Sequence, residues 1–123
     1  MRPLHLLVTS ALVAGALAMP AASAEGAVAA PPPCHAHVCL WTGANYTGAV
    51  FAWWEGNGNV FVGGTHADNV GSFVANRGAC FVDTADSEWN WHDRRRASDG
   101  DYSANYRGRF GYKMDRIAPA RYC

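Results

Sequence analysis

The densest group of side chains that could do chemistry is Cys34-His35-Ala36-His37-Val38-Cys39. Thiolate and imidazole groups are ligands that zinc and copper use in proteins. The spacing of this group, however, matches neither a zinc finger nor a zinc ribbon. We therefore interpret the two cysteines as disulfide-forming rather than metal-binding.

Two short patterns could indicate acid–base catalysis. They are His66-x-Asp68 and His92-Asp93, and each places a carboxylate close to an imidazole. Patterns of two residues carry little weight alone. The sequence contains neither Gly-x-Ser-x-Gly nor His-Glu-x-x-His, and no plausible nucleophile with a base beside it. The sequence therefore predicts a binding protein and not an enzyme.

The first 24 residues have the features of an export signal. Arg2 supplies a positive charge, and Leu4 to Met19 is an apolar stretch that Pro20 ends. Ala22-Ser23-Ala24 then forms a small-x-small cleavage site. The apolar stretch falls short of the about 20 strongly apolar residues that a membrane-spanning helix needs. We therefore expect residues 1–24 to be a signal peptide and the protein to be secreted.

The secreted part is expected to be one domain. Residues 25–33 form an Ala- and Pro-rich leader, and residues 34–123 form the domain. A chain this short has a marginal core, and an even number of cysteines in an exported chain indicates two disulfides. The residues alone do not choose among the three possible pairings of Cys34, Cys39, Cys80 and Cys123.

The charge balance excludes some partners. The chain has 10 Lys and Arg against 10 Asp and Glu, so loss of Arg2 leaves a net charge of about −1. Nucleic-acid-binding proteins carry a clear basic excess. The one basic run, Arg94-Arg95-Arg96, is flanked by Asp93 and Asp99, so we expect a solvated loop there. We predict a monomer that binds neither nucleic acid nor membranes.

Frequent glycines divide the domain into short segments rich in β-branched and aromatic residues. Segments of this length and composition are typical of strands. Residues 84–98 are polar, and we expect a long loop or a short strand there. The sequence thus predicts an all-β domain with strands at Val38 to Trp41, Ala49 to Trp54, Val60 to Val62, Phe73 to Ala75 and Cys80 to Val82.

An internal repeat supports this fold class. Ala44-Asn45-Tyr46-Thr47-Gly48 recurs as Ala104-Asn105-Tyr106-Arg107-Gly108. Each copy follows a strand that begins with a cysteine, and each precedes an aromatic strand, Val50 to Trp53 and Phe110 to Tyr112. Two such units could bury each other's apolar faces. We therefore expect a disulfide-stapled β-sandwich with an internal pseudo-twofold repeat, whose second copy carries an insert of about 19 residues.

The first copy reads Trp41-x4-Tyr46-x-Gly48, which resembles the Greek-key signature of the βγ-crystallins. In such a folded hairpin the glycine would take a positive φ that a residue with a Cβ resists. The tyrosine would cover the hairpin, with the tryptophan packed beside it. The resemblance implies a βγ-crystallin-like Greek-key sandwich.

The second copy of this motif is incomplete. Tyr106 and Gly108 match, but Asp101 stands where the first aromatic residue belongs, and Tyr102 follows one place later. We expect Tyr102 to substitute with a shift of one residue.

Within this superfamily, the region from Cys34 to Cys123 resembles the secreted actinobacterial peptidase inhibitor family I36. The resemblance implies a secreted protein that inhibits an extracellular peptidase. The features that carry it are the signal peptide, Cys34-x4-Cys39, the segment from Cys39 to Gly48, Asp68 to Ser72 before a strand, the apolar strand at Cys80 and the final Cys123.

The resemblance also agrees with one disulfide pairing. A Cys34–Cys39 bond would pin the entry to the first strand, and Cys80–Cys123 would tie the second half to the chain end. Closing the larger loop would stabilise the fold by roughly 3–4 kcal/mol.

Asp68-Asn69-Val70-Gly71-Ser72 resembles a calcium half-site of the βγ-crystallins. Oxygen ligands of this kind suit Ca²⁺. Phe73 replaces the final serine of the pattern, and the paired half-site near Asp115 to Pro119 has arginine and proline in place of ligands. We expect at most weak calcium binding at Asp68, Asn69 and Ser72 and no other cofactor. A turn held by Asx-type hydrogen bonds is the alternative.

The insert from Asp83 to Asp101 is the expected inhibitory loop. Its aromatic and basic side chains could anchor a partner, and either a metallopeptidase or a serine peptidase could be the target. A glycan- or cell-wall-binding or toxin-like secreted protein is the alternative, in which the paired tryptophans stack on sugar rings. The residues expected to contact the peptidase are Trp89, Trp91, Arg94, Arg95 and Arg96.

Overall fold

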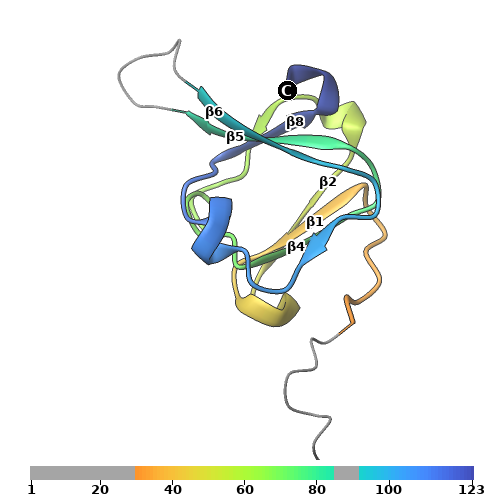
Figure 1. Cartoon of the computed structure of the whole chain (residues 1–123), viewed down its shortest axis with the longest axis vertical. Coiled ribbons are helices and arrows are strands. Elements are labelled where there is room, and N and C mark those ends of the chain that lie inside the picture. The colour runs from red at the N-terminus through yellow and green to blue at the C-terminus, as the bar shows by residue number, and fades with distance from the viewer. Residues whose placement is uncertain (1–29, 85–91) are drawn as a thin grey trace, which may run out of the picture.

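The computed structural model describes residues 30–84 and 92–123. Two antiparallel four-stranded sheets pack face to face (Figure 1). The first sheet has the order β2 (Val50–Trp53), β1 (Val38–Trp41), β4 (Ser72–Ala75) and β7 (Tyr102–Ser103). The second has the order β3 (Val60–Phe61), β8 (Arg116–Pro119), β5 (Ala79–Thr84) and β6 (His92–Ala97). Short helical turns connect them: η1 (Ala44–Tyr46), η2 (Glu55–Asn57), η3 (Arg107–Gly111) and η4 (Ala120–Tyr122).

The two sheets have matching strand orders. We match β1 to β4 in order with β5 to β8, and β5 to β8 in order with β1 to β4. The order β2-β1-β4-β7 of the first sheet then becomes β6-β5-β8-β3, which is the second sheet read from its other edge. The registers match as well, because Trp41 lies opposite Ser72 and Val82 lies opposite Arg116 at the same ends of the central strands. This arrangement is the one that a pseudo-twofold repeat of a four-stranded unit would produce.

The repeated pentapeptides do not mark this correspondence, so their predicted equivalence is wrong. Ala44 to Gly48 lies between β1 and β2, whereas Ala104 to Gly108 lies between β7 and β8. The reason is that the presumed insert contains the strand β6 of the second half, and β7 follows it before the second pentapeptide. The two segments are neighbours instead, because the N–H of Asn45 donates a hydrogen bond of 2.7 Å to the carbonyl oxygen of Ala104.

The expected aromatic strand at Phe110 to Tyr112 is also wrong. These residues belong to η3 and to the turn after it. Phe110 is buried, and the N–H of Val70 donates a hydrogen bond of 3.0 Å to the carbonyl oxygen of Gly111. The tight turn therefore docks against the loop before β4 instead of pairing in a sheet.

The core lies between the inner faces of the sheets. Its largest fully buried side chains include Leu40, Trp53, Phe81, Met114 and Ile117. The rings of Phe73 in β4 and Phe81 in β5 meet edge to face with centroids 5.1 Å apart, so aromatic contacts bridge the two sheets.

The two disulfides pair Cys34 with Cys39 and Cys80 with Cys123, as the family resemblance implied. The first fixes the entry to β1, and the second ties β5 to the chain end after η4. Within the described residues, no helix is both long enough and apolar enough to cross a membrane.

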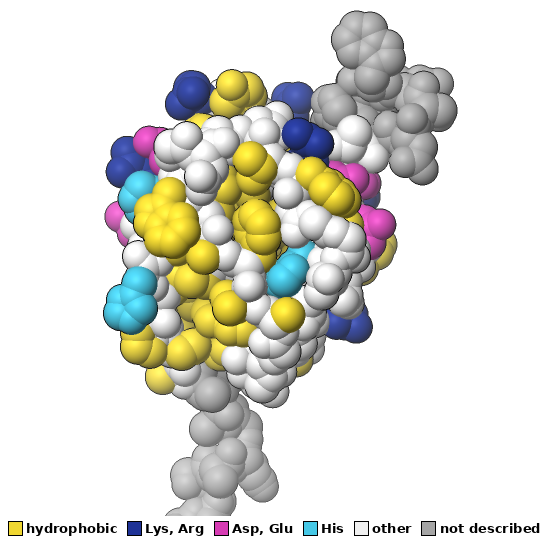
Figure 2. All heavy atoms as spheres, turned by 180° about the vertical axis from the view of Figure 1, so that it is seen from behind, with side chains coloured by type: hydrophobic (Ala, Val, Ile, Leu, Met, Phe, Trp, Pro, Cys, Tyr) yellow, Lys and Arg dark blue, Asp and Glu magenta, His cyan; other side chains and the backbone are white. Residues whose placement is uncertain are grey.

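Hydrophobic side chains also reach the surface. On the face shown in Figure 2 they gather over the middle, and most charged side chains lie toward the margin. Val50, Trp54 and Phe61 are each about half exposed. The arginines of β6 are therefore the better candidates for a charged recognition surface.

Candidate functional site

The arginines expected in a loop lie in β6, so the loop prediction is wrong for them. Each of the three pairs with a residue of β5, with Arg95 opposite Phe81 and Arg96 opposite Cys80. The strand forms because β5 is an apolar central strand whose backbone groups need a partner on both sides. Long charged side chains are tolerated at an edge strand, where they can reach solvent.

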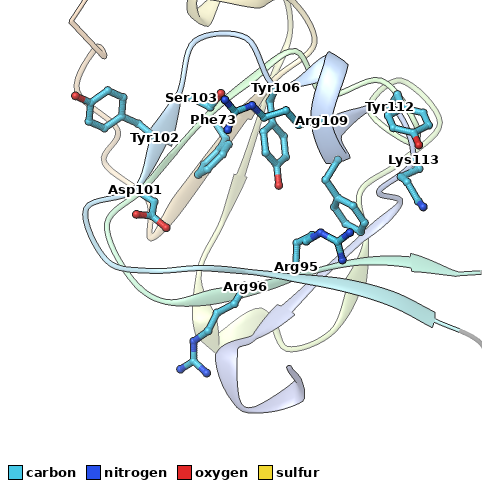
Figure 3. A pocket seen from close by; sticks show the side chains of 11 residues that line it. Phe73, Arg95, Arg96, Asp101, Tyr102, Ser103, Tyr106, Arg109, Tyr112 and Lys113 are labelled. Carbon is cyan, nitrogen blue, oxygen red and sulfur yellow. The ribbon is translucent and has the colours of Figure 1, made fainter.

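Strand alternation sends the arginines to opposite faces of the sheet. Arg95 lies opposite Phe81 and is therefore on the inner face, where its guanidinium carbon is 5.1 Å from the centroid of the Phe110 ring. Arg96 points away from this side (Figure 3). Arg94 lines a small cavity of about 290 Å³ together with Arg116. The side chains of the basic run therefore lie on two faces of the sheet and do not form a single basic surface.

Asp93 links β6 to the turn after η3. Its carboxylate accepts a hydrogen bond of 2.9 Å from Arg95 and another of 2.9 Å from the Lys113 ammonium group. The hydrogen bond with Lys113 is the main reason why the pKa of Asp93 is lowered and that of Lys113 is raised. The pairing therefore favours the charged form of both groups, and Asp93 also holds Arg95 through its hydrogen bond.

Trp89 and Trp91 lie outside the described residues. Their role as peptidase anchors, and the alternative role as a stacking platform for sugars, remain predictions.

The first motif has the predicted hairpin geometry. Gly48 has a φ of 86°, and the rings of Trp41 and Tyr46 meet edge to face with centroids 5.4 Å apart. The buried hydroxyl of Ser72 closes the turn by donating to the carbonyl oxygen of Gly43 and accepting from the N–H of Tyr46. These backbone hydrogen bonds support a structural role for the motif, although the buried hydroxyl of Tyr46 has no partner among the described residues.

The second copy has a different geometry. Tyr106 enters the core, where its ring lies 4.7 Å from that of Phe73 and 5.8 Å from that of Phe81. Gly108 is not among the described glycines with positive φ, and a Cβ added there would meet nothing within 4 Å. Tyr102 is half exposed on β7 and covers no equivalent hairpin.

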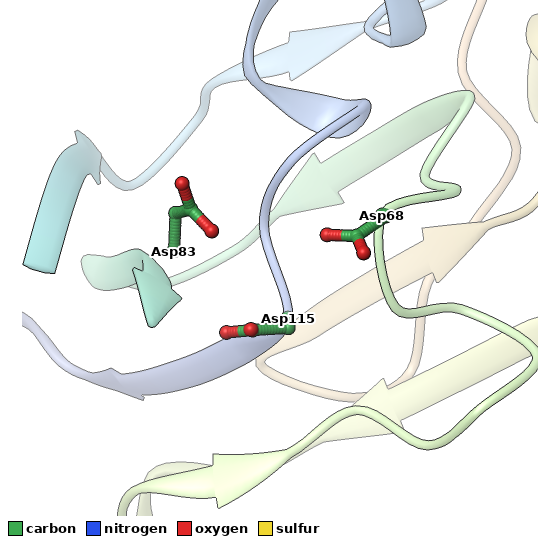
Figure 4. Close-up of side chains that lie close together, drawn as sticks. All are labelled: Asp68, Asp83 and Asp115. Carbon is green, nitrogen blue, oxygen red and sulfur yellow. The ribbon is translucent and has the colours of Figure 1, made fainter. Parts of the chain in front are cut away.

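Three aspartates converge at one end of the sandwich (Figure 4). Carboxylate oxygens of Asp68, Asp83 and Asp115 all lie within 4.8 Å of one another. Asp68 comes from the loop before β4, Asp83 from the end of β5, and Asp115 from the residue before β8. The pKa of Asp83 is raised mainly by desolvation and next by the charge of Asp115, while Lys113 at 3.9 Å partly offsets this effect.

Sequence reasoning found only part of this cluster. Asp68 belongs to it, but the Asn69 amide donates to the carbonyl oxygen of Thr65, and the Ser72 hydroxyl is used in the hairpin. Asp115 was expected in a separate half-site, and Asp83 was seen only as the start of an insert. The sequence signal for Asp83 and Asp115 was their position at the end of one strand and just before another. Because β5 and β8 are antiparallel neighbours, these two ends lie side by side.

Two histidines, His37 and His66, serve the fold. The Nδ1 atom of His37 accepts a hydrogen bond of 2.9 Å from the N–H of Glu55. His66 is buried, and its Nε2 atom lies 3.1 Å from the carbonyl oxygen of Ala49. The Cys34–Cys39 disulfide leaves no thiolate beside His35 and His37, so this group is not the cysteine–histidine metal site considered from the sequence.

Comparisons with known proteins agree on a family and a fold. Residues 27–98 match the model of the family described as peptidase inhibitor family I36. No curated protein matches the chain significantly.

Two similar solved structures are βγ-crystallin domains. One is described under "Evolution of the eye lens beta-gamma-crystallin domain fold" and has a TM-score of 0.52 and 20% sequence identity. The matched region covers 73% of this chain and 90% of that chain. The other is a βγ-crystallin domain of Abundant Perithecial Protein from Neurospora crassa in the Ca²⁺-bound form. It has a TM-score of 0.50 and 16% sequence identity, and the matched region covers 72% of this chain and 92% of that chain. The chain therefore has a βγ-crystallin-like fold.

Proposed function

The chain belongs to peptidase inhibitor family I36, and on this premise we propose that it is a secreted protein that binds and inhibits an extracellular peptidase. The proposed contact surface is the β5–β6 hairpin, which includes the arginines Arg94 to Arg96 and flanks the two tryptophans Trp89 and Trp91.

One observation carries the choice of this surface. β6 is an edge strand, and among the described strands its only neighbour in the sheet is β5. An edge strand presents unpaired backbone N–H and C=O groups, and an extended segment of a partner can pair with them. Figure 1 shows the joined ends of β5 and β6 projecting from the body of the sandwich, which would let them enter the cleft of a peptidase.

The base of this hairpin is well anchored. Ala79, Cys80 and Phe81 at the start of β5 are fully buried, and Cys80 is bonded to the chain end. A surface that is already ordered before binding loses less conformational entropy on association. The rigidity of the base therefore supports an inhibitor that holds one shape in the cleft.

A peptidase panel tests the function. The purified protein, with both disulfides formed, is titrated against a thermolysin-like metallopeptidase, a subtilisin-like and a trypsin-like serine peptidase. We expect stoichiometric inhibition of one class, which also names the target chemistry. Absence of inhibition by folded and uncleaved protein would contradict the proposal.

Two double variants test the surface separately from the function. Trp89→Ala with Trp91→Ala, and Arg94→Ala with Arg96→Ala, are each expected to weaken inhibition at least tenfold, a typical loss for anchor residues. Arg107→Ala is the matched control, because Arg107 is an exposed arginine that lies outside the hairpin and donates to the carbonyl oxygen of Thr42. Full inhibition by both double variants would move the contact surface elsewhere while leaving the inhibitor function in place.

A second role is supported by the acidic cluster, and we propose that Asp68, Asp83 and Asp115 bind calcium weakly. Hard oxygen donors are what Ca²⁺ prefers, and the three carboxylates fit such an ion because they converge from separate segments. A bound ion would relieve the mutual repulsion that helps to raise the pKa of Asp83. Asn69 and Ser72 take no part in this proposed site.

A further inference from the structure

A cavity of about 600 Å³ opens between β6, β7 and η3 (Figure 3). It shares Arg95 and Arg96 with the proposed peptidase contact surface, whereas its other lining residues belong neither to that surface nor to the proposed calcium site. Its volume lies within the range of about 300–1,000 Å³ that is usual for small-molecule sites. Its wall combines aromatic rings with cationic groups, which is the composition of a binding site rather than of a packing defect.

The floor of the cavity is a buried tyrosine. The Tyr106 side chain is only 9% exposed, and its hydroxyl points into the cavity between Phe73 and Arg95 (Figure 3). That hydroxyl makes no hydrogen bond to any residue in the described ranges. Burial raises the pKa of Tyr106 to about 12, so the group keeps its proton and remains a donor. Because the hydroxyl opens onto the cavity, a bound ligand can take the place of water as its hydrogen-bond partner.

Two guanidinium groups line the cavity together with this hydroxyl. They belong to Arg95 and Arg109, whose charges both oppose the effect of burial on the pKa of Tyr106. The Nη1 group of Arg95 donates to Asp93 and to the carbonyl oxygen of Arg94, and its other N–H groups have no hydrogen bond to a described residue. Arg109 has no hydrogen bond or ion pair with any residue that the structure describes. The two arginines and the tyrosine thus offer hydrogen-bond donors to the same cavity.

The charge of the cavity fits an anion. Arg95, Arg96, Arg109 and Lys113 line it together with a single carboxylate, Asp101, whose oxygen accepts a hydrogen bond of 2.7 Å from the N–H of Ser98. Asp93, just outside, offsets one more positive charge because it holds both Arg95 and Lys113. The net excess is therefore about two positive charges, which favours an anionic ligand such as a carboxylate.

The mouth of the cavity offers an aromatic face. Tyr112 lines it and is 55% exposed, with Lys113 beside it. Flat aromatic faces next to donor groups suit a sugar ring, and the space exceeds what a single carboxylate side chain would fill. We propose that the cavity binds an acidic sugar, whose carboxylate lies between Arg95, Arg109 and the Tyr106 hydroxyl and whose ring lies toward Tyr112.

Titration monitored by amide NMR tests this site with three probes. They are a galacturonic acid trisaccharide, the neutral galactose trisaccharide and a tripeptide of glutamate. The acidic trisaccharide is expected to shift the amide signals of Tyr106 and Arg109 and to bind at least tenfold more tightly than the other two. Equal binding of the neutral sugar, tighter binding of the peptide, or no binding would each overturn the proposal.

Variants separate the cavity from other basic sites. Tyr106→Phe keeps the packed ring and loses only the hydroxyl, and Arg109→Gln removes an exposed charge that holds no described partner, so each is expected to weaken binding about tenfold. Arg121→Gln is the control, because Arg121 lies 5.2 Å from the Tyr122 ring, much as Arg95 does from Phe110. An equal loss in the control would overturn the site.

Peptidase inhibition measured on the same variants keeps the two proposals distinguishable. Tyr106→Phe and Arg109→Gln are expected to leave inhibition unchanged, because neither residue lies on the β5–β6 hairpin. A protein that inhibits a peptidase but ignores the acidic sugar would overturn the cavity proposal alone.

Discussion

The hydroxyl oxygen of Ser72 accepts a hydrogen bond of 2.9 Å from the backbone N–H of Tyr46, so the start of β4 holds the turn that follows β1. The same hydroxyl donates a hydrogen bond of 2.7 Å to the carbonyl oxygen of Gly43. Ser72 is fully buried. The packing of the Tyr46 ring against Trp41 therefore depends on Ser72, which belongs to another strand of the same sheet.

Replacing Ser72 by alanine is expected to lower the free energy of unfolding by about 1–3 kcal/mol, because the N–H of Tyr46 and the carbonyl of Gly43 would lose their partner. Denaturant unfolding measures the loss. Ser98→Ala is the control, because Ser98 is exposed and its side chain has no hydrogen bond to a described residue. Equal losses in the two variants would contradict a bridging role for Ser72.

Gly111→Ala is expected to destabilise the protein by about 1–3 kcal/mol or more, because a Cβ there would collide with the carbonyl oxygen of Val70 and crowd that of Tyr106. Gly108→Ala is a matched control in the same turn. Its Cβ would meet nothing within 4 Å, so we expect a change of less than about 1 kcal/mol. Thermal unfolding of both variants checks the difference, and similar melting temperatures would disprove the close approach of η3 to Val70.

Asp83→Asn is expected to raise the melting temperature at neutral pH. Burial, followed by the charge of Asp115, raises the pKa of Asp83, so the ionised carboxylate opposes folding. A raised pKa in the folded state stabilises the fold at pH values below the unfolded pKa, and this contribution is lost as the pH rises through the folded value. The advantage of the variant should therefore vanish in acid, near and below the ordinary pKa of 3.8. An advantage that persists unchanged in acid would show another cause.

The same variant should respond less to calcium. A ligand that binds only the folded state raises its stability, so millimolar Ca²⁺ is expected to raise the melting temperature of the wild type more than that of Asp83→Asn. Asp99→Asn removes an exposed carboxylate outside the cluster and should respond as the wild type does. An equal calcium response in all three proteins would rule out the acidic cluster as the site.

The two disulfides should differ in strength. Removing Cys80–Cys123 by double alanine substitution is expected to cost about 3–4 kcal/mol, because its cysteines are 43 positions apart and the bond restricts a long loop of the unfolded chain. Removing Cys34–Cys39, whose cysteines are 5 positions apart, should cost about 2 kcal/mol. Denaturant unfolding ranks the two variants, and the reverse order would mean that strain or residual structure outweighs loop closure.

The sequence by itself determined the features that depend on neighbours along the chain. The strand at Val38 to Trp41 and the left-handed Gly48 follow from local propensity and from the steric demand of a tight turn. The strands at Phe73 to Ala75 and Cys80 to Val82 could be predicted for the same reason. The family could be recognised because its motif is a run of adjacent residues.

The tertiary structure alone decided the features that depend on residues far apart. Arg94 to Arg96 are polar enough for a loop, yet they form a strand because β5 needs a backbone partner at its open edge. Tyr106 looks like a second copy of Tyr46 in sequence, but its place after β7 sends it into the core. The convergence of Asp68, Asp83 and Asp115 likewise comes from strand pairing. Local pattern cannot specify such placements, since they are set by which sheet each strand joins and in what order.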